Sequence, residues 1–308
     1  MNKFSLAIIG SSKIAQIHYK FLKGYNFSKV FFISRSLIKI LNFLIENKIT
    51  RVKTLVKKKI NQKNFDVISI CNNTNYHQDY LDLIVNVPKL LIIEKPIISI
   101  KIFQRDYKIY LKKIYKKFRN IIVVYPMVFL ARSILSIVNI NSKIKKIEIH
   151  YYTSGKERGD EIFIDLSPHA LTFFYEICKL NKIKLDKVIK IKIDTQPKIW
   201  LGTIFYKDIK LLMNFKKISK REKSKFFVKI NNFKIDRITK QKNGIFTNYL
   251  EFKKKIILIQ NPMKNVFDDA VNSIVKKKLF KKNKDLTNWL MDITEKIYFN
   301  KKIKKKII

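Results

Sequence analysis

The chain has 308 residues, 47% of them apolar, which excludes a disordered chain and, at roughly 150 residues per domain, favours two domains. Lys and Arg outnumber Asp and Glu by 66 to 23, and the resulting net charge of +43 raises nucleic acid or an anionic membrane as a partner. However, Lys, Ile, Asn and Phe, whose codons are rich in A and T, are abundant throughout. We attribute most of the charge to composition drift and expect no specific nucleic-acid partner.

The two cysteines, Cys71 and Cys178, provide neither a disulfide framework nor a paired-cysteine metal motif, so we expect a reducing, cytoplasmic location. The first ten residues lack the features of a signal peptide, and no stretch approaches the roughly 20 apolar residues of a membrane span. We therefore expect a soluble protein with no membrane partner. The four histidines show no metal-ligand spacing, and no metal site is predicted.

The first part of the chain alternates apolar strands with helical periodicity, which is typical of a doubly wound parallel sheet. The predicted strands cover residues 4–9, 29–33, 65–71, 90–93 and 121–125. The predicted helices cover residues 14–22, 37–45, 76–85 and 103–118.

Beyond residue 126 the pattern changes to successive strands, which indicates a second domain with a largely antiparallel sheet. The predicted strands cover residues 145–153, 188–193, 200–206, 209–215, 225–230, 233–238 and 246–252. Helices are expected near residues 129–138, in a segment ending near residue 179, and over residues 266–275 and 286–298. We place the two domains at residues 1–120 and 121–308.

A glycine turn joins the first strand to the first helix, where the backbone amides of a helix N-terminus can bind a dinucleotide pyrophosphate. Against the pattern GxGxxG/A, the sequence reads Gly10-Ser11-Ser12-Lys13-Ile14-Ala15, with Ser12 in place of the second glycine. An ordinary strand-to-helix turn is the alternative. At the end of the second strand, Ser34 and Arg35 replace the usual acidic residue and suit a 2′-phosphate, so NADP is favoured over NAD.

Two further motifs carry candidate chemistry. Glu94-Lys95-Pro96 follows an apolar strand, and the proline favours a rigid turn that projects a charged side chain at the carboxyl edge of the sheet; a surface turn is the alternative. In the segment 165–170, Ser167 is predicted to cap a helix that begins at Pro168 and runs to about Lys179. His169 would then lie in the first helical turn, where imidazolium is disfavoured, with Asp165 orienting its ring. The alternative is a structural cap with an incidental histidine.

Taken together, these motifs resemble the Gfo/Idh/MocA family of NAD(P)-dependent oxidoreductases. The resemblance covers Gly10 with residues 15–18, residues 66–70 with His77, residues 94–96 and residues 165–170. It implies an N-terminal Rossmann domain and a C-terminal α/β domain with an open sheet, which serves substrate binding or a homo-oligomer interface. The chain departs from the family pattern at Ser12, at Asn72-Asn73 and at residues 128–131.

The resemblance also assigns roles. It implies catalysis by Lys95, Asp165 and His169. It implies cofactor binding by Gly10, Ser11, Ser12, Lys13, Ile14, Ser34, Arg35, Asn72, Asn73, His77, Glu94 and Lys95. Lys95 and His169 would also contact the substrate, and Tyr152, Lys156 and Arg158 could contact an anionic or hydroxylated substrate from a loop that is otherwise simply exposed.

These observations support the hypothesis of reversible hydride transfer between a nicotinamide and a carbinol or carbonyl carbon of a small molecule, namely a sugar, cyclitol or sugar nucleotide. In this hypothesis His169 exchanges a proton with the substrate oxygen and Lys95 stabilises its developing negative charge. The alternative is a non-catalytic dinucleotide sensor on the same fold, motivated by the altered glycine turn. A third hypothesis, that the protein binds nucleic acid, is supported by the net charge alone.

Overall fold

A computed structural model of the chain describes residues 4–25, 27–99, 107–138, 143–185, 188–242, 245–274 and 278–305. It divides into two compact units. The first comprises Met1–Val124 and Val266–Thr287, and the second comprises Tyr125–Asn265 and Asn288–Ile308.

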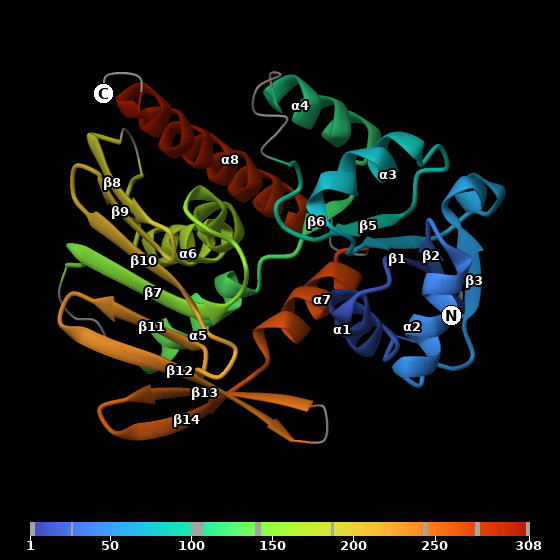
Figure 1. Cartoon of the computed structure of the whole chain (residues 1–308), viewed down its shortest axis with the longest axis horizontal. Helices are drawn as coiled ribbons and strands as arrows, with labels where there is room; N and C mark the ends of the chain where they lie inside the picture. Colours follow the sequence, from blue (N-terminus) through green and yellow to red (C-terminus); the bar gives the residue numbers. More distant parts are fainter. Residues whose placement is uncertain are drawn as a thin grey trace. The chain divides into compact units, whose positions relative to one another are not determined.

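The first unit is built on a parallel sheet with the strand order β3-β2-β1-β4-β5-β6 (Figure 1). Its strands are β1 (Ser5–Ile9), β2 (Lys29–Ser34), β3 (Lys53–Val56), β4 (Val67–Ile70), β5 (Leu90–Ile93) and β6 (Ile121–Val123). The sequence prediction is confirmed for five of them but missed β3, a four-residue edge strand without a buried side chain. Chain order reverses between β1 and β4, and ligands of such sheets bind at the carboxyl ends of the strands near that point.

Helices cover both faces of this sheet, with α1 and α2 on one side and α3 and α4 on the other (Figure 1). The helices are α1 (Lys13–Leu22), α2 (Leu37–Glu46), α3 (His77–Leu83) and α4 (Tyr107–Lys117), with 3-10 turns η1 (Lys57–Gln62) and η2 (Thr74–Tyr76). The helix predicted over residues 103–118 is confirmed as α4, while residues 103–106 lie outside the described residues. The Ser36 hydroxyl caps α2 by accepting from the Lys39 N–H.

Two C-terminal segments complete the first unit. In α7 (Pro262–Asn272), the Phe267 ring packs edge-on against His18 at 4.8 Å, and Asp268 accepts a hydrogen bond from the Tyr25 hydroxyl. In α8 (Lys278–Lys305), the Asn283 side chain exchanges two hydrogen bonds of 2.9 Å with the Val123 backbone. These contacts add α7 and the first turns of α8 to the parallel sheet and its helices.

The second unit is built on an eight-stranded sheet with the order β14-β13-β12-β11-β7-β10-β9-β8, in which only the β7–β10 pair is parallel. The strands are β7 (Lys146–Ser154), β8 (Lys190–Gln196), β9 (Ile199–Phe205), β10 (Lys210–Ile218), β11 (Lys225–Ile230), β12 (Phe233–Lys242), β13 (Ile245–Phe252) and β14 (Lys255–Ile259). The predicted fold class, a parallel sheet followed by a largely antiparallel one, is confirmed. The sequence prediction missed β14, an edge strand that begins directly after the left-handed residues Lys253 and Lys254.

The second unit also contains α5 (Pro126–Ile137), α6 (Asp160–Leu180) and the part of α8 from Asn288 onward, and α5 packs against α6. α6 also packs on β7, β9 and β10. Its buried rings Phe163 and Phe174 meet sheet residues, since Phe163 stacks on Trp200 at 4.6 Å and Phe174 on Tyr206 at 5.7 Å. One face of the sheet is therefore a hydrophobic core under α6.

Candidate functional site

The glycine turn of the first unit needs one glycine and tolerates the loss of the second. Gly10 follows β1 with φ of +136°, and a Cβ on it would lie 3.2 Å from the Cys71 carbonyl oxygen. Ser12, the N-cap residue of α1, has φ of −129°, which any residue adopts without strain. The amides of the first turn of α1, beginning with the exposed residues Lys13 and Ile14, therefore follow a turn of the phosphate-binding kind.

Other polar groups lie at the carboxyl ends of β2 and β4. Arg35, directly after Ser34 at the end of β2, places its guanidinium 4.0 Å from the centre of the Tyr76 ring. The buried Asn72 Oδ1, shortly after β4, has no hydrogen-bond partner among the described residues. Asn73, in contrast, caps the next turn by accepting from the Asn75 N–H at 3.0 Å. The edge thus carries a cation over an aromatic ring and, in the loop after β4, a buried acceptor without a partner among the described residues.

Glu94 belongs to a buried hydrogen-bonded group that the sequence analysis did not predict. His18 of α1, fully buried, contacts Ser69 Oγ of β4 through Nδ1 at 2.7 Å and Glu94 Oε1 through Nε2 at 2.8 Å. Burial alone would raise the pKa of Glu94, but the hydrogen bond and charge of His18 and the charge of Lys95 outweigh it and lower the pKa. His18 therefore connects the middle of α1 to β4 and to the residue that follows β5.

His77 fixes the turn that carries Lys95. Its Nδ1 lies 3.1 Å from the Pro96 carbonyl oxygen and its Nε2 lies 3.1 Å from the Asn72 carbonyl oxygen. Burial lowers the pKa of His77, more than the carbonyl contacts raise it, so the neutral ring is favoured and donates to one of the two carbonyls. His77 thus connects the loop after β4 to the half-buried Lys95 turn.

In the second unit, the predicted start of the helix around His169 was wrong, whereas its predicted end near Lys179 is confirmed. α6 begins at Asp160 with Gly159 as its N-cap residue, and Pro168 lies inside the helix. Asp160 and Glu161 favour this earlier start, because acidic side chains stabilise a first helical turn. His169 therefore lies in mid-helix without the predicted influence of a helix N-terminus, and Asp165 is one turn before it on the same helix face.

Asp165 is paired with a residue that the sequence analysis missed. Lys217 of β10 is 3% exposed and places its Nζ 2.8 Å from Asp165 Oδ2 and 2.7 Å from Glu157 Oε2. Burial, the largest effect, favours the neutral amine, but the two carboxylates together outweigh it and raise the pKa of Lys217. Strand alternation could have identified this residue, because Lys217 follows the buried residues Met213 and Phe215 at intervals of two along β10.

The structure brings His169 together with Tyr151 and separates it from Tyr152. The Tyr151 and His169 rings meet edge-on at 5.6 Å. Tyr152 is the next residue of β7 and therefore faces the other side of the sheet, where Asn214 donates to its hydroxyl at 3.3 Å. Lys156 and Arg158 are exposed in the loop between β7 and α6.

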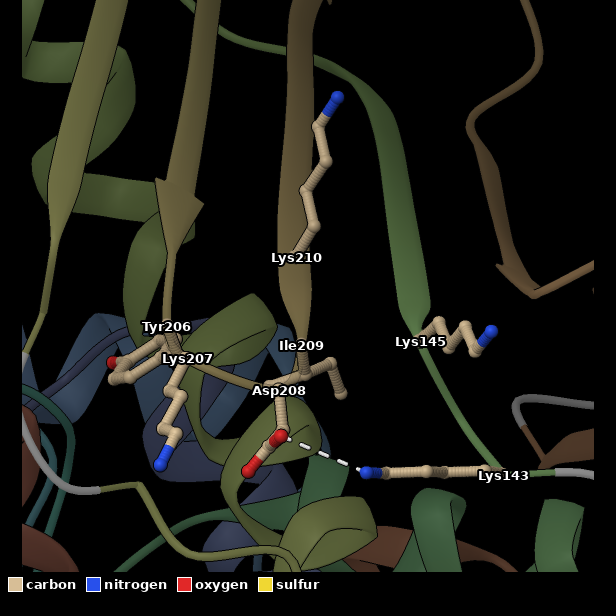
Figure 2. A pocket seen from close by; sticks show the side chains of 7 residues that line it. All are labelled: Lys143, Lys145, Tyr206, Lys207, Asp208, Ile209 and Lys210. Atoms are coloured by element: carbon tan, nitrogen blue, oxygen red, sulfur yellow. Dashed lines mark ion pairs between the residues drawn. The ribbon is translucent and has the colours of Figure 1, made fainter.

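A hollow of about 360 Å³ in the second unit lies elsewhere, around the turn between β9 and β10 and the residues before β7. Figure 2 shows that Lys143 points at Asp208, 3.6 Å away, whereas the amino groups of Lys145, Lys207 and Lys210 point in different directions. These lysines do not converge on one ligand position.

Within the described ranges, no helix has the length and apolar character needed to cross a membrane. No three His, Cys, Asp or Glu side chains of the described part gather where they could hold a metal ion.

No protein-family model and no curated protein sequence matches the chain. Solved structures do. A Gfo/Idh/MocA family oxidoreductase from Vibrio cholerae is 11% identical, with 96% of this chain and 100% of that chain covered and a TM-score of 0.59. The UDP-N-acetylglucosamine 3-dehydrogenase GnnA from Acidithiobacillus ferrooxidans is 9% identical, with coverages of 96% and 99% and a TM-score of 0.63. GenD2 from gentamicin A biosynthesis, in complex with NAD, is 8% identical, with coverages of 94% and 93% and a TM-score of 0.65.

These likenesses extend over nearly the whole of each chain and establish the fold. The chain has the two-part fold of Gfo/Idh/MocA oxidoreductases, as the motif resemblance implied.

Proposed function

We propose that the protein is a nicotinamide-dependent oxidoreductase acting on CH–OH groups or the corresponding carbonyls. The observation that carries the proposal is the set of polar groups at the carboxyl edge of the parallel sheet: the Gly10 turn, the buried Asn72 Oδ1 without a partner among the described residues, and the Lys95 turn. They occur on a fold that solved dehydrogenases share. In this proposal the N-terminal domain binds the cofactor and the C-terminal domain binds the substrate.

The residues at this edge fit a dinucleotide. The first turn of α1 supplies amides for a pyrophosphate, together with the hydroxyls of Ser11 and Ser12. Arg35, held over Tyr76, suits a 2′-phosphate, and the absence of an acidic residue at positions 34 and 35 disfavours an unphosphorylated ribose. We therefore propose NADP as the preferred cofactor and NAD as the alternative. When bound, the nicotinamide supplies the group that accepts or donates hydride.

The protein residues would handle the proton and the charge on the substrate. In the oxidation direction, we propose that His169 accepts the proton of the substrate hydroxyl, with Asp165 stabilising the imidazolium that forms. Lys95 would donate a hydrogen bond to the same oxygen and stabilise its negative charge. In reduction, His169 returns the proton to that oxygen.

The proposed substrate is a sugar, cyclitol or sugar nucleotide. Support comes from the motif resemblance and from GnnA, which is described as acting on a UDP-sugar. Lys156 and Arg158 are exposed in the loop that precedes α6, the helix of His169, and would suit an anionic substrate group. A homo-oligomer formed through the sheet of the second unit is a further part of this proposal.

The test is titration with NADPH and NADH, followed by turnover assays with a panel of polyols, sugars and sugar nucleotides. We expect NADPH to bind tightly, and we expect Lys95→Ala and His169→Ala to lower kcat by 10²-fold or more because each removes a group that acts on the reacting oxygen. Matched controls are Lys112→Ala on the exposed side of α4 and His150→Ala on β7. Equal loss in variants and controls, or no turnover with any substrate, would contradict the proposal.

A non-catalytic dinucleotide sensor is the second candidate. Ser12, in place of a glycine, is the observation that favours it, because a side chain now stands where a phosphate approaches the backbone. This candidate predicts dinucleotide binding without turnover, and hydride transfer with any substrate would exclude it.

A further inference from the structure

Strand β10 ends its inward-facing row with a charged residue. The row consists of Leu211, Met213, Phe215 and Lys217, whose exposed fractions are 0%, 0%, 0% and 3%. The first three pack in the hydrophobic core under α6. An ammonium group at the fourth position requires compensating charges, because a buried and unpaired cation is strongly unfavourable.

Two carboxylates from different segments provide this compensation. Asp165 of α6 lies 2.8 Å from Lys217 Nζ, and Glu157 of the loop before α6 lies 2.7 Å from it. The loop leaves space for the pair at Gly155, where a Cβ would lie 2.7 Å from Lys217 Nζ and would collide with the Glu157 carboxylate. The hydrogen bond to Lys217 is the main cause of the lowered pKa of Glu157, so this carboxyl is held as an anion.

The cluster of Lys217, Asp165 and Glu157 lies beside His169. Asp165 and His169 are four residues apart on α6, a spacing that places Cβ atoms about 5–6 Å apart on one helix face. Tyr151 of β7 contacts the His169 ring and is exposed to the charges of Asp165, Lys217 and Arg237 of β12. Asp165, Lys217 and Arg237 therefore act on the ring that contacts His169, and Glu157 is linked to them through its ion pair with Lys217, which binds both carboxylates.

We propose that Lys217 is a positioning residue: it fixes the Asp165 carboxylate and offsets its charge, and thereby sets the proton affinity of His169. Together Lys217, Asp165 and Glu157 carry a charge of −1, whereas the two carboxylates alone carry −2. Removing the lysine strengthens the attraction for a proton on His169. The catalytic consequence of this inference rests on the proposed function, but its electrostatic part concerns His169 alone.

The test is a titration of the four histidines by NMR on ¹³C-labelled protein, with His169→Ala used to assign the His169 signal. In Lys217→Met we expect the His169 titration midpoint to rise by about one pH unit, the usual size of a shift caused by a nearby charge. Lys217→Arg should keep it near the wild-type value. The matched control is Lys216→Met, the same change one residue earlier on the strand, where the side chain is exposed. An unchanged midpoint in folded Lys217→Met would overturn the proposal.

Glu157→Gln provides the second variant should Lys217→Met fail to fold, because it removes one negative charge from a partly exposed position. It should lower the His169 midpoint, opposite to Lys217→Met, and an unchanged or raised midpoint would overturn the proposal. If the protein turns over a substrate, the pH profile of kcat should shift in the same direction as the NMR midpoint in each variant. If it turns over none, the NMR result still decides the role of Lys217 while the proposed function fails separately.

Discussion

At the scale of single residues, the turn after β1 shows how backbone geometry separates essential from replaceable glycines. Gly10 combines a positive φ with close approach to the backbone of Cys71 and Asn72, whereas Ser12 occupies an extended conformation open to any residue. The first position is fixed by the fold, and the second would be constrained only by a ligand. This difference explains why the fold survives the departure from the glycine pattern.

Gly10→Ala should therefore destabilise the protein. The added methyl group meets backbone atoms at 3.2–3.3 Å in a conformation that L-residues rarely adopt, and we expect a loss of about 1–3 kcal/mol in the free energy of unfolding. Urea denaturation measures this loss. Gly24→Ala is the control, since its Cβ would lie 3.8 Å from the nearest atom, the Phe21 carbonyl oxygen. Equal stability of the two variants would show that the Gly10 conformation is not required.

Arg35 gives a prediction about cofactor choice. Arg35→Ala removes the cation held over Tyr76, so we expect the Kd for NADPH to rise by 10-fold or more and the Kd for NADH to change little. Quenching of protein fluorescence measures both constants. Lys39→Ala, an exposed change on α2, serves as the control for general loss of positive charge. Equal weakening of both cofactors would contradict the assignment of Arg35 to a 2′-phosphate.

At the scale of elements, buried polar groups connect segments that are distant in sequence. His18 of α1 bonds to Ser69 at β4 and to Glu94 directly after β5, and all three lie near the carboxyl ends of adjacent strands. On the face of the second sheet that does not face α6, Glu148 of β7 contacts Lys146 at 2.5 Å, His150 at 3.3 Å and Lys229 of β11 at 3.4 Å. The stability that each of these groups provides therefore depends on the pH or on the presence of its partner.

His18→Leu should destabilise the first unit more than loss of packing alone. The substitution leaves the Glu94 carboxylate without its main partner in a largely buried position, an effect of about 3–5 kcal/mol. The free energy of unfolding, measured by denaturant titration, should recover in part in the double variant His18→Leu/Glu94→Leu, in which no charge remains. No recovery in the double variant would show that the loss comes from packing.

The lowered pKa of Glu148 predicts that the stability of the second unit falls at acidic pH. Burial would raise the pKa of this carboxyl, but Lys146, His150 and Lys229 lower it from 4.5 to about 2. Because the folded-state pKa is lowered, its stabilisation is present above pH 4.5 and is lost as the pH falls toward 2. Glu148→Gln should lose roughly 1–2 kcal/mol near pH 6, a value reduced for the exposure of both lysines.

The pH dependence of unfolding by urea measures the effect. The Glu148→Gln variant should lose less stability than the wild type between pH 4.5 and pH 2, and Glu251→Gln on β13 is the matched control. Parallel pH curves for wild type and Glu148→Gln would contradict this account.

At the scale of the whole molecule, the charge of +43 produces attraction to polyanions whatever the function. We predict weak binding to duplex DNA at about 50 mM salt that falls by roughly 10³-fold or more by about 200 mM salt, because it depends on counterion release. Fluorescence anisotropy with two unrelated DNA sequences measures it. Sequence preference, or binding that persists at the higher salt concentration, would contradict the view that the charge reflects composition.

The sequence by itself determined the fold class, most strands and helices, and the placement of Gly10 after β1 and of Lys95 after β5, because apolar periodicity and turn chemistry are local. Only the tertiary structure revealed Lys217 as the partner of Asp165 and the contacts of His18 with Ser69 and Glu94, because these pairings depend on strand register and on segments 51 to 76 residues apart. It also moved the start of α6 from Pro168 to Asp160. The local Ser-Pro signal of a helix N-terminus was overridden by burial of the preceding turns, at Ile162, Phe163 and Leu166, against the rest of the second unit.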